Sequence, residues 1–155
     1  IFIKSNMGTC LSVDISYGKK IPKDLNVKEL PEFIPPIDSG RVVKVYDGDT
    51  ITIASRLPNT DGPIYRFSVR LNGIDTPEIR GKSVAEKELA IVVRDALRER
   101  IMHQIVELRN VANEKYGRIL ADVYIDNVSI NDWLVEQNFA VPYTGGKKMR
   151  PANWD

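Results

Sequence analysis

The alternation of hydrophobic and polar residues predicts three consecutive β-strands after residue 40. Segments 41–46 and 49–54 are rich in β-branched residues, which fit the pleated surface of a strand. The Asp47-Gly48 pair between them is typical of the tight turn of a β-hairpin. In segment 64–71, apolar Tyr65, Phe67 and Val69 alternate with polar residues. The body of the chain is therefore expected to begin with three β-strands.

A helix over about 83–102 is predicted next. Ser83 and Glu86 have the spacing of a capping box, in which each side chain satisfies a backbone amide of the first turn. Apolar residues then recur at helical spacing. Segments 104–108 and 119–125 read as strands, and Ser129 can cap a short last helix that includes Phe139. This order favours a short barrel packed against helices, because a closed barrel leaves few open sheet edges.

Residues 1–39 lack this periodicity and are predicted to form an irregular N-terminal arm, separate from a domain at 40–155. The arm contains Pro22, Pro31 and Pro35-Pro36, and proline both lacks a backbone donor and restricts its neighbour. If translation begins at Met7, the next residues match the N-myristoylation pattern at Gly8, with Cys10 available for a second acyl chain. The alternative is a chance match, with Cys10 an ordinary thiol. The first case predicts attachment to a membrane through the N-terminus, and the second a soluble protein.

Composition narrows the chemistry that the chain can perform. With 155 residues, 43% of them hydrophobic, the chain can bury one core. Lys and Arg number 22 against 21 Asp and Glu, so the net charge of +1 excludes a strongly basic nucleic-acid coat. One cysteine and one histidine exclude an internal disulfide and a zinc cluster. Any metal would have to be a hard cation held by carboxylates and carbonyls.

Two turns and two arginines carry the candidate chemistry. Asp47-Gly48-Asp49 places two carboxylates at one turn, and Asp75 and Glu78 lie three residues apart beside a proline. Taken singly, such groups are ordinary turn, cap or surface residues. Taken together with Arg70 and Arg118, they form a set in which Ca²⁺ and paired guanidinium groups neutralise the charge of a phosphodiester.

Three segments carry a resemblance to a known family. The runs VYDGDTITI, VRLNGIDTPE and KYGRILADVY, in this order, closely resemble the staphylococcal nuclease (thermonuclease-like) family over residues 40–143. The resemblance implies an α+β fold with a five-stranded OB-fold β-barrel packed with helices. The loop after Glu78 is shorter than the lysine-rich loop of the secreted bacterial enzyme, so a weaker grip on the phosphate backbone is expected.

The resemblance also implies roles for the residues that match its motifs. Asp49, Asp75 and the backbone carbonyl of Thr76 match ligands of Ca²⁺, and Asp47 has the place of an acid that helps to hold the metal site. Glu78 matches the general base or the group that orients the attacking water, and Arg70 and Arg118 match the arginines that clamp the scissile phosphate. Three further positions match residues near the bound nucleotide, namely Lys115, Tyr116 and Tyr143.

These roles imply a Ca²⁺-dependent endonuclease, a phosphodiester hydrolase that acts as a monomer. Its expected substrates are DNA and RNA, with single strands favoured, and its products carry 3′-phosphate ends. The alternative is a catalytically inactive OB-fold module of the same family that binds nucleic acid or protein. Inactive copies usually lose a ligand or an arginine, whereas this chain keeps Asp49, Arg70, Asp75, Glu78 and Arg118.

Overall fold

The structure, a computed structural model, describes residues 2–4, 10–12, 20–146, 151 and 154, and it divides the chain into two units. In the first unit, Ile1–Glu32, strands β1 (Phe2–Lys4) and β2 (Cys10–Ser12) pair antiparallel, and η1 (Val27–Glu29) is a short 3₁₀ turn. The second unit is Phe33–Asp155. It begins earlier than the boundary expected at residue 40, and Ile37 belongs to its core.

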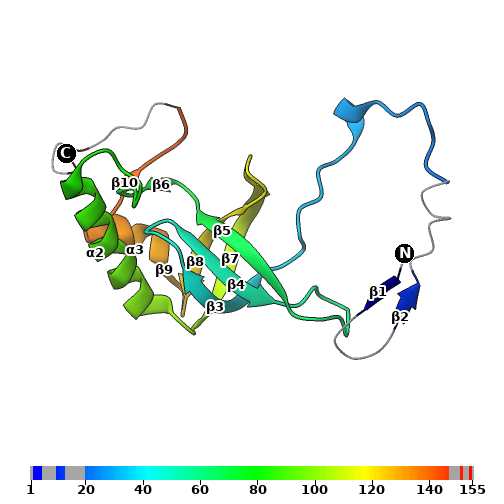
Figure 1. The fold of residues 1–155 in the computed structure, drawn as a ribbon, viewed down its shortest axis with the longest axis horizontal. Coiled ribbons are helices and arrows are strands. Elements are labelled where there is room, and N and C mark those ends of the chain that lie inside the picture. Colours follow the sequence, from blue (N-terminus) through cyan, green and yellow to red (C-terminus); the bar gives the residue numbers. More distant parts are fainter. Residues whose placement is uncertain (1, 5–9, 13–19, 147–150, 152–153, 155) are drawn as a thin grey trace. The chain divides into compact units, whose positions relative to one another are not determined.

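Five strands of the second unit close into a barrel (Figure 1). The neighbour order is β5-β4-β3-β7-β8, and all these neighbours pair antiparallel. A parallel pairing between β5 and β8 joins the two ends of the sheet. The strands are β3 (Ser39–Val45), β4 (Thr50–Ser55), β5 (Tyr65–Leu71), β7 (Ile105–Asn113) and β8 (Ile119–Ile125). The predicted α+β fold with a five-stranded OB-type barrel is therefore confirmed.

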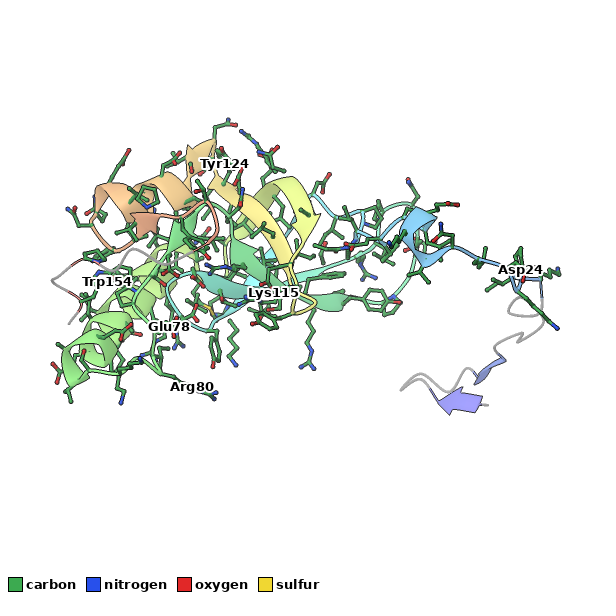
Figure 2. The ribbon with its side chains drawn as sticks, turned by 90° about the horizontal axis from the view of Figure 1, so that it is seen from above. Asp24, Glu78, Arg80, Lys115, Tyr124 and Trp154 are labelled. Atoms are coloured by element: carbon green, nitrogen blue, oxygen red, sulfur yellow. The ribbon has the colours of Figure 1, made fainter. Side chains whose placement is uncertain are left out.

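Two helices and three short strands complete the second unit. Helix α2 (Val84–Ile101) and helix α3 (Ile130–Glu136) lie at the same end of the barrel, as Figure 1 and Figure 2 show. Strand β9 (Val128–Ser129) extends the sheet beside β8, while β6 (Ile74–Asp75) pairs with β10 (Val141–Pro142). None of the helices in the described part of the chain is long and apolar enough to cross a membrane.

Helix α2 is held to the barrel by one apolar face. Ala90, Val93, Leu97 and Ile101 are fully buried, and their spacing of three or four residues places them on the same side of the helix. The alternate residues of the strands, such as Val42 and Ile53, fill the barrel interior. Burial of this face fixes the N-terminal end of α2, and with it the loop 76–82 that leads into the helix.

Candidate active site

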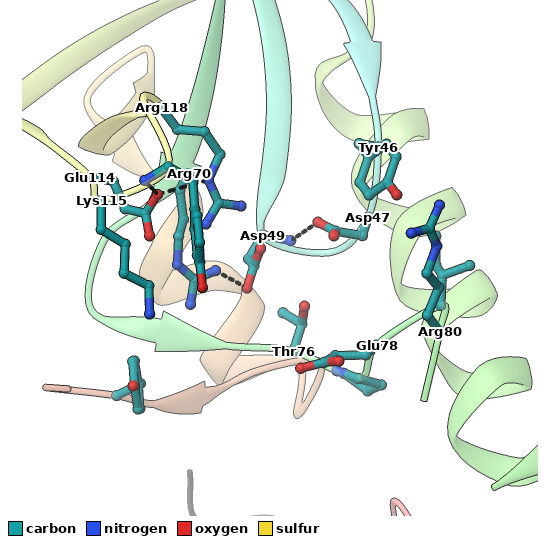
Figure 3. A pocket seen from close by; sticks show the side chains of 14 residues that line it. Tyr46, Asp47, Asp49, Arg70, Thr76, Glu78, Arg80, Glu114, Lys115 and Arg118 are labelled. Atoms are coloured by element: carbon teal, nitrogen blue, oxygen red, sulfur yellow. Dashed lines mark hydrogen bonds and ion pairs between the residues drawn. The ribbon is translucent and has the colours of Figure 1, made fainter. Parts of the chain in front are cut away.

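One cavity of about 410 Å³ gathers most of the predicted site residues (Figure 3). Its floor and walls come from the β3–β4 turn, the end of β5, the loop after β6 and the β7–β8 loop. The predicted residues that line it are Asp47, Asp49, Arg70, Thr76, Glu78, Lys115, Tyr116, Arg118 and Tyr143. Asp75, on β6, is 2% exposed and is not among the residues that line the cavity. Gly8 and the side chain of Cys10 lie outside the described residues.

The tight turn between β3 and β4 presents the first carboxylates. The Asp49 amide donates to Asp47 Oδ1 at 3.1 Å, and the Tyr46 amide donates to the Thr50 carbonyl at 2.9 Å. A Cβ atom at Gly48 would lie 2.6 Å from Val93 Cγ1 and 2.9 Å from Thr76 Oγ1. The absence of a side chain at Gly48 therefore lets the turn approach both α2 and the loop that carries Glu78.

Arg70 joins the two predicted carboxylate ligands. Its Nη1 donates to Asp49 Oδ2, and its Nη2 donates to the Ile74 carbonyl at 3.1 Å and lies 3.7 Å from Asp75 Oδ1. The other Asp49 oxygen, Oδ1, accepts from Thr50 Oγ1 at 2.9 Å. Burial by itself would lower the pKa of Arg70, but the Asp49 carboxylate outweighs it and the pKa is raised above its ordinary value. The guanidinium therefore stays charged at any pH at which the protein is folded.

At Asp47, the acid at the start of the β3–β4 turn, the surroundings disfavour the charged form. Burial and the neighbouring charge of Asp49 raise the pKa of Asp47 from 3.8 to about 6. The site thus holds more negative charge than its surroundings stabilise easily, even with Arg70 in place. An additional cation near Asp49 would lower this cost.

Arg118 is positioned by Glu114, an acid that the sequence analysis did not identify. Glu114 Oε2 accepts from Arg118 Nε at 3.2 Å and from the Tyr116 amide at 3.0 Å, while Arg118 Nη1 donates to Thr50 Oγ1 at 3.3 Å. Burial by itself would raise the pKa of Glu114, but these hydrogen bonds and the charge of Arg118 lower it. The spacing of four residues between Glu114 and Arg118 was the available signal. This acid aims one of the two arginines at the cavity.

Glu86, which the sequence analysis assigned only to the capping box, organises the loop that carries Glu78. Ser83 Oγ accepts from the Glu86 amide at 3.0 Å, which is one of the two bonds of the predicted capping box. The Glu86 carboxylate is fully buried and accepts from the amides of Lys82 at 3.1 Å and Glu78 at 3.3 Å. A Cβ at Gly81 would lie 2.2 Å from Glu86 Oε2, so the loop wraps closely around this carboxylate. Glu86 thus fixes the backbone of Glu78 itself.

The donor set suits a hard cation. Among the described residues, no three His, Cys, Asp or Glu side chains gather as a metal site. The predicted set needs only two carboxylates, those of Asp49 and Asp75, together with the Thr76 carbonyl, and all three groups offer oxygen. Both carboxylates already face the guanidinium of Arg70, which shows that a positive charge is stable between them. Oxygen donors of this kind fit Ca²⁺ rather than a softer metal.

The fold and the site together define a class of protein. It is a small OB-type barrel with arginines and carboxylates gathered in one cavity beside the barrel, an arrangement suited to a phosphodiester. The chain belongs to the staphylococcal nuclease homologue family, whose model matches residues 68–153, more than half of the chain. The resemblance noted in the three sequence motifs is therefore confirmed.

Curated relatives agree with this family. An uncharacterized endonuclease of Haemophilus influenzae is 31% identical over 103 residues, which cover 66% of this chain and 51% of the relative. An uncharacterized protein of Methanocaldococcus jannaschii is 25% identical, over 72% of this chain and 62% of the relative. An uncharacterized endonuclease of Escherichia coli is 29% identical, over 81% of this chain and 73% of the relative. The chain therefore spans between half and two thirds of the first two relatives.

Proposed function

We propose that this chain is a Ca²⁺-dependent endonuclease that hydrolyses DNA and RNA, favours single strands and leaves 3′-phosphate ends. The observation that carries the proposal is the meeting of Arg70, Arg118, Asp49 and Glu78 in one cavity, although they come from four separate segments of the barrel domain. The family of the chain supports it, and so do two relatives that are named as endonucleases.

The two arginines would hold the phosphate that is attacked. Arg70 reaches the cavity from β5 and Arg118 from the β7–β8 loop, so they can bind different oxygens of one phosphate group. As water attacks, negative charge grows on these oxygens, and fixed guanidinium groups stabilise the charge more in the transition state than in the ground state. Arg118 would also stabilise the departing 5′-oxygen.

Glu78 would take the proton of the attacking water. Its side chain is exposed in the cavity, and its backbone is fixed by Glu86. In the reaction, the water oxygen forms a bond to phosphorus and gives one proton to Glu78, the bond from phosphorus to the 5′-oxygen breaks, and the departing 5′-oxygen takes up a proton from solvent to become a hydroxyl. The phosphate stays on the 3′-oxygen of the other product.

Asp49, Asp75 and the Thr76 carbonyl would hold Ca²⁺. When bound, the ion would supply positive charge beside the phosphate and offset the charge of Asp49, which together with burial raises the pKa of Asp47. Both of its carboxylate ligands contact Arg70 in this structure, so the guanidinium and the ion would share the two acids.

Three side chains on the rim would contact the rest of the nucleotide. Tyr116 is 73% exposed, and Lys115 Nζ lies 4.7 Å from the centre of its ring. Tyr143 lines the same cavity, and its hydroxyl donates to the Gly146 carbonyl at 3.1 Å. An exposed aromatic ring beside an ammonium group suits a base and its phosphate.

The competing proposal is an inactive module of the same family that binds nucleic acid or protein. The observation in its favour is the ion pair between Arg70 and Asp49, which occupies both a phosphate-binding group and a metal ligand. Such a module would still present the exposed Tyr116 and Lys115 to a nucleic acid.

Cleavage of a single-stranded oligodeoxynucleotide, with Ca²⁺ or with a chelator, separates the two proposals. We expect cleavage only with Ca²⁺, and a loss of at least about 10²-fold in rate for Glu78→Gln, the size typical of losing one essential group. Glu88→Gln, an exposed change on α2, is the matched control. Equal results with Ca²⁺ and chelator would support the inactive module, and near-full activity of Glu78→Gln would remove the proposed base.

Two further proposals concern the state of the chain. We propose that it acts as a monomer, which gel filtration with light scattering tests. Attachment to a membrane through acylated Gly8 and Cys10 stays a prediction, because those groups lie outside the described residues. Mass spectrometry of the N-terminus of protein made in a eukaryotic host tests it, and an unmodified Ile1 would end it.

A further inference from the structure

Tyr46 is a cavity residue that the proposed mechanism does not use. It lies directly after β3 and is 46% exposed, which is unusual for a large ring beside a buried turn. The bond from its amide to the Thr50 carbonyl fixes its backbone within the hairpin. Lys44 Nζ lies 5.5 Å from the centre of the ring, so a cation already accompanies it. A fixed, half-exposed ring with a cation beside it is equipped to bind a flat ligand.

Arg80 lines the same cavity from the loop between β6 and α2. Its side chain is exposed, whereas the backbone around it is restrained: the Gly81 amide donates to the Glu78 carbonyl at 2.7 Å, and the Glu86 carboxylate holds the amides on both sides of it. In Figure 3, Tyr46 and Arg80 lie on one side of Asp49, and Lys115 and Arg118 lie on the other side.

The cavity therefore has an aromatic residue and a cation on each of two sides of Asp49. Lys115 lies over the Tyr116 ring on one side, and Tyr46 and Arg80 share the other side. Single-stranded nucleic acids are bound by this combination, in which bases stack on rings and phosphates meet cations. A duplex keeps its bases stacked on one another and offers none to the ring.

We propose that Tyr46 and Arg80 form a second nucleotide-binding subsite, in which the Tyr46 ring stacks on a base and Arg80 binds the adjoining phosphate. The inference rests on the proposed nuclease function and makes it more specific. The enzyme holds single-stranded nucleotides on both sides of the scissile phosphate, which selects an unpaired oligonucleotide over a duplex or a small phosphodiester.

The test compares two substrates of the full chain in Ca²⁺: a single-stranded oligodeoxynucleotide, and bis(p-nitrophenyl) phosphate, which carries no base. Tyr46→Ala should lower the ratio of kcat/KM for the oligonucleotide to kcat/KM for the small diester about 5- to 150-fold, the range for loss of one base–aromatic stack. Tyr46→Phe, which keeps the ring, should restore the ratio. Tyr65→Ala is the matched control, because Tyr65 is 43% exposed and lies outside the residues that line the cavity.

Binding provides a second measurement that does not need catalysis. With a labelled single strand in Ca²⁺, and with every protein carrying Glu78→Gln to suppress cleavage, Arg80→Gln should reduce the slope of log affinity against log salt by about 0.7, the value for one phosphate contact on a single strand. Lys87→Gln, an exposed change on α2, should leave the slope unchanged.

The outcomes separate the subsite from the proposed function. If the wild type cleaves in Ca²⁺ and Tyr46→Ala changes the substrate ratio no more than Tyr65→Ala does, the subsite is wrong and the nuclease stands. If the wild type cleaves neither substrate, and Tyr46→Ala still weakens strand binding at least 5-fold, the nuclease proposal is wrong and the subsite belongs to an inactive module. If neither cleavage nor strand binding responds to Tyr46→Ala, the subsite is overturned.

Discussion

Replacing Glu86 by alanine or by glutamine tests how the loop that carries Glu78 is held. The Glu86 carboxylate is fully buried and accepts the amides of Glu78 and Lys82. A buried donor left without its acceptor costs about 1–3 kcal/mol. Glu86→Ala removes the acceptor of both amides, and water from the neighbouring cavity can reach part of the loop, so we expect a loss of about 3 kcal/mol in the free energy of unfolding. Glu86→Gln keeps one acceptor oxygen and should cost about half of that.

Urea unfolding at pH 7, followed by tryptophan fluorescence, measures both losses. The control is Glu88→Ala, an exposed position on the same helix, which should stay within about 0.5 kcal/mol of the wild type. If Glu86→Ala also stays within about 0.5 kcal/mol, the two amides do not depend on this carboxylate. The reasoning would equally fail if Glu86→Gln cost as much as Glu86→Ala, since the loss would then follow the charge and not the number of acceptors.

The remaining predictions concern three positions around the cavity. Gly81→Ala would bring a Cβ within 2.2 Å of Glu86 Oε2, so it should destabilise by about 1–3 kcal/mol and reduce kcat, as thermal unfolding and initial rates would show. In chelator, the free energy of unfolding of the wild type should fall relative to that of Asp47→Asn as pH rises from about 4 to about 6, because the folded wild type binds the Asp47 proton more tightly than the unfolded chain does; a stability difference between the two proteins in urea that stays constant across this range would refute it. Arg118→Lys should reduce kcat about 10²-fold, because a single ammonium group cannot both pair with Glu114 and bind the phosphate. Steady-state kinetics measures this loss, and an unfolding experiment should show that the variant is as stable as the wild type.

The barrel strands could be predicted because their pattern is local. Strands β4 and β5 alternate buried and accessible residues over most of their length, and a period of two is visible without knowledge of the partner strand. Strand β7 is different: it extends to Asn113, beyond the predicted end at residue 108. Its register with β8 shifts between Arg109 and Ala112, and Asn110 has φ = 53°. This bulge interrupts the alternation, so the second half of the strand leaves no periodic signal.

Short elements and helix ends were also beyond the sequence pattern. Strands β6 and β10 have two residues each and exist only because Asp75 and Val141 meet in the folded chain. Helix α3 ends at Glu136, although Phe139 continues its apolar spacing. The Phe139 ring still packs edge-on against Trp133, with 5.9 Å between the ring centres. This contact, and not a further turn of helix, accounts for an apolar residue at position 139.

The site shows the same division between local and long-range information. The sequence motifs named most of the described residues that line the cavity, because each motif is a turn or a strand end, but they did not name Tyr46, Arg80 or Glu114. They could not show what holds those residues in place. Glu86 fits a capping box from its spacing to Ser83, yet its burial and its bonds to Glu78 and Lys82 depend on how the loop folds back over α2. The residues that orient the site therefore leave weaker traces in the sequence than the residues that would act in it.

A net charge of +1 is compatible with a polyanionic substrate because the charges are placed unevenly. Arg70 pairs with Asp49 and Asp75, Asp47 lines the cavity beside Asp49, and burial together with the charge of Asp49 raises the pKa of Asp47 to about 6. The cations on the rim, Lys115 and Arg80, are exposed to solvent. A phosphate strand would therefore meet positive charge first and the acidic floor last. Binding of Ca²⁺ to that floor would remove the repulsion at the point where the phosphate comes closest. We therefore expect the affinity for a single strand to change more on addition of Ca²⁺ than on a change in salt concentration.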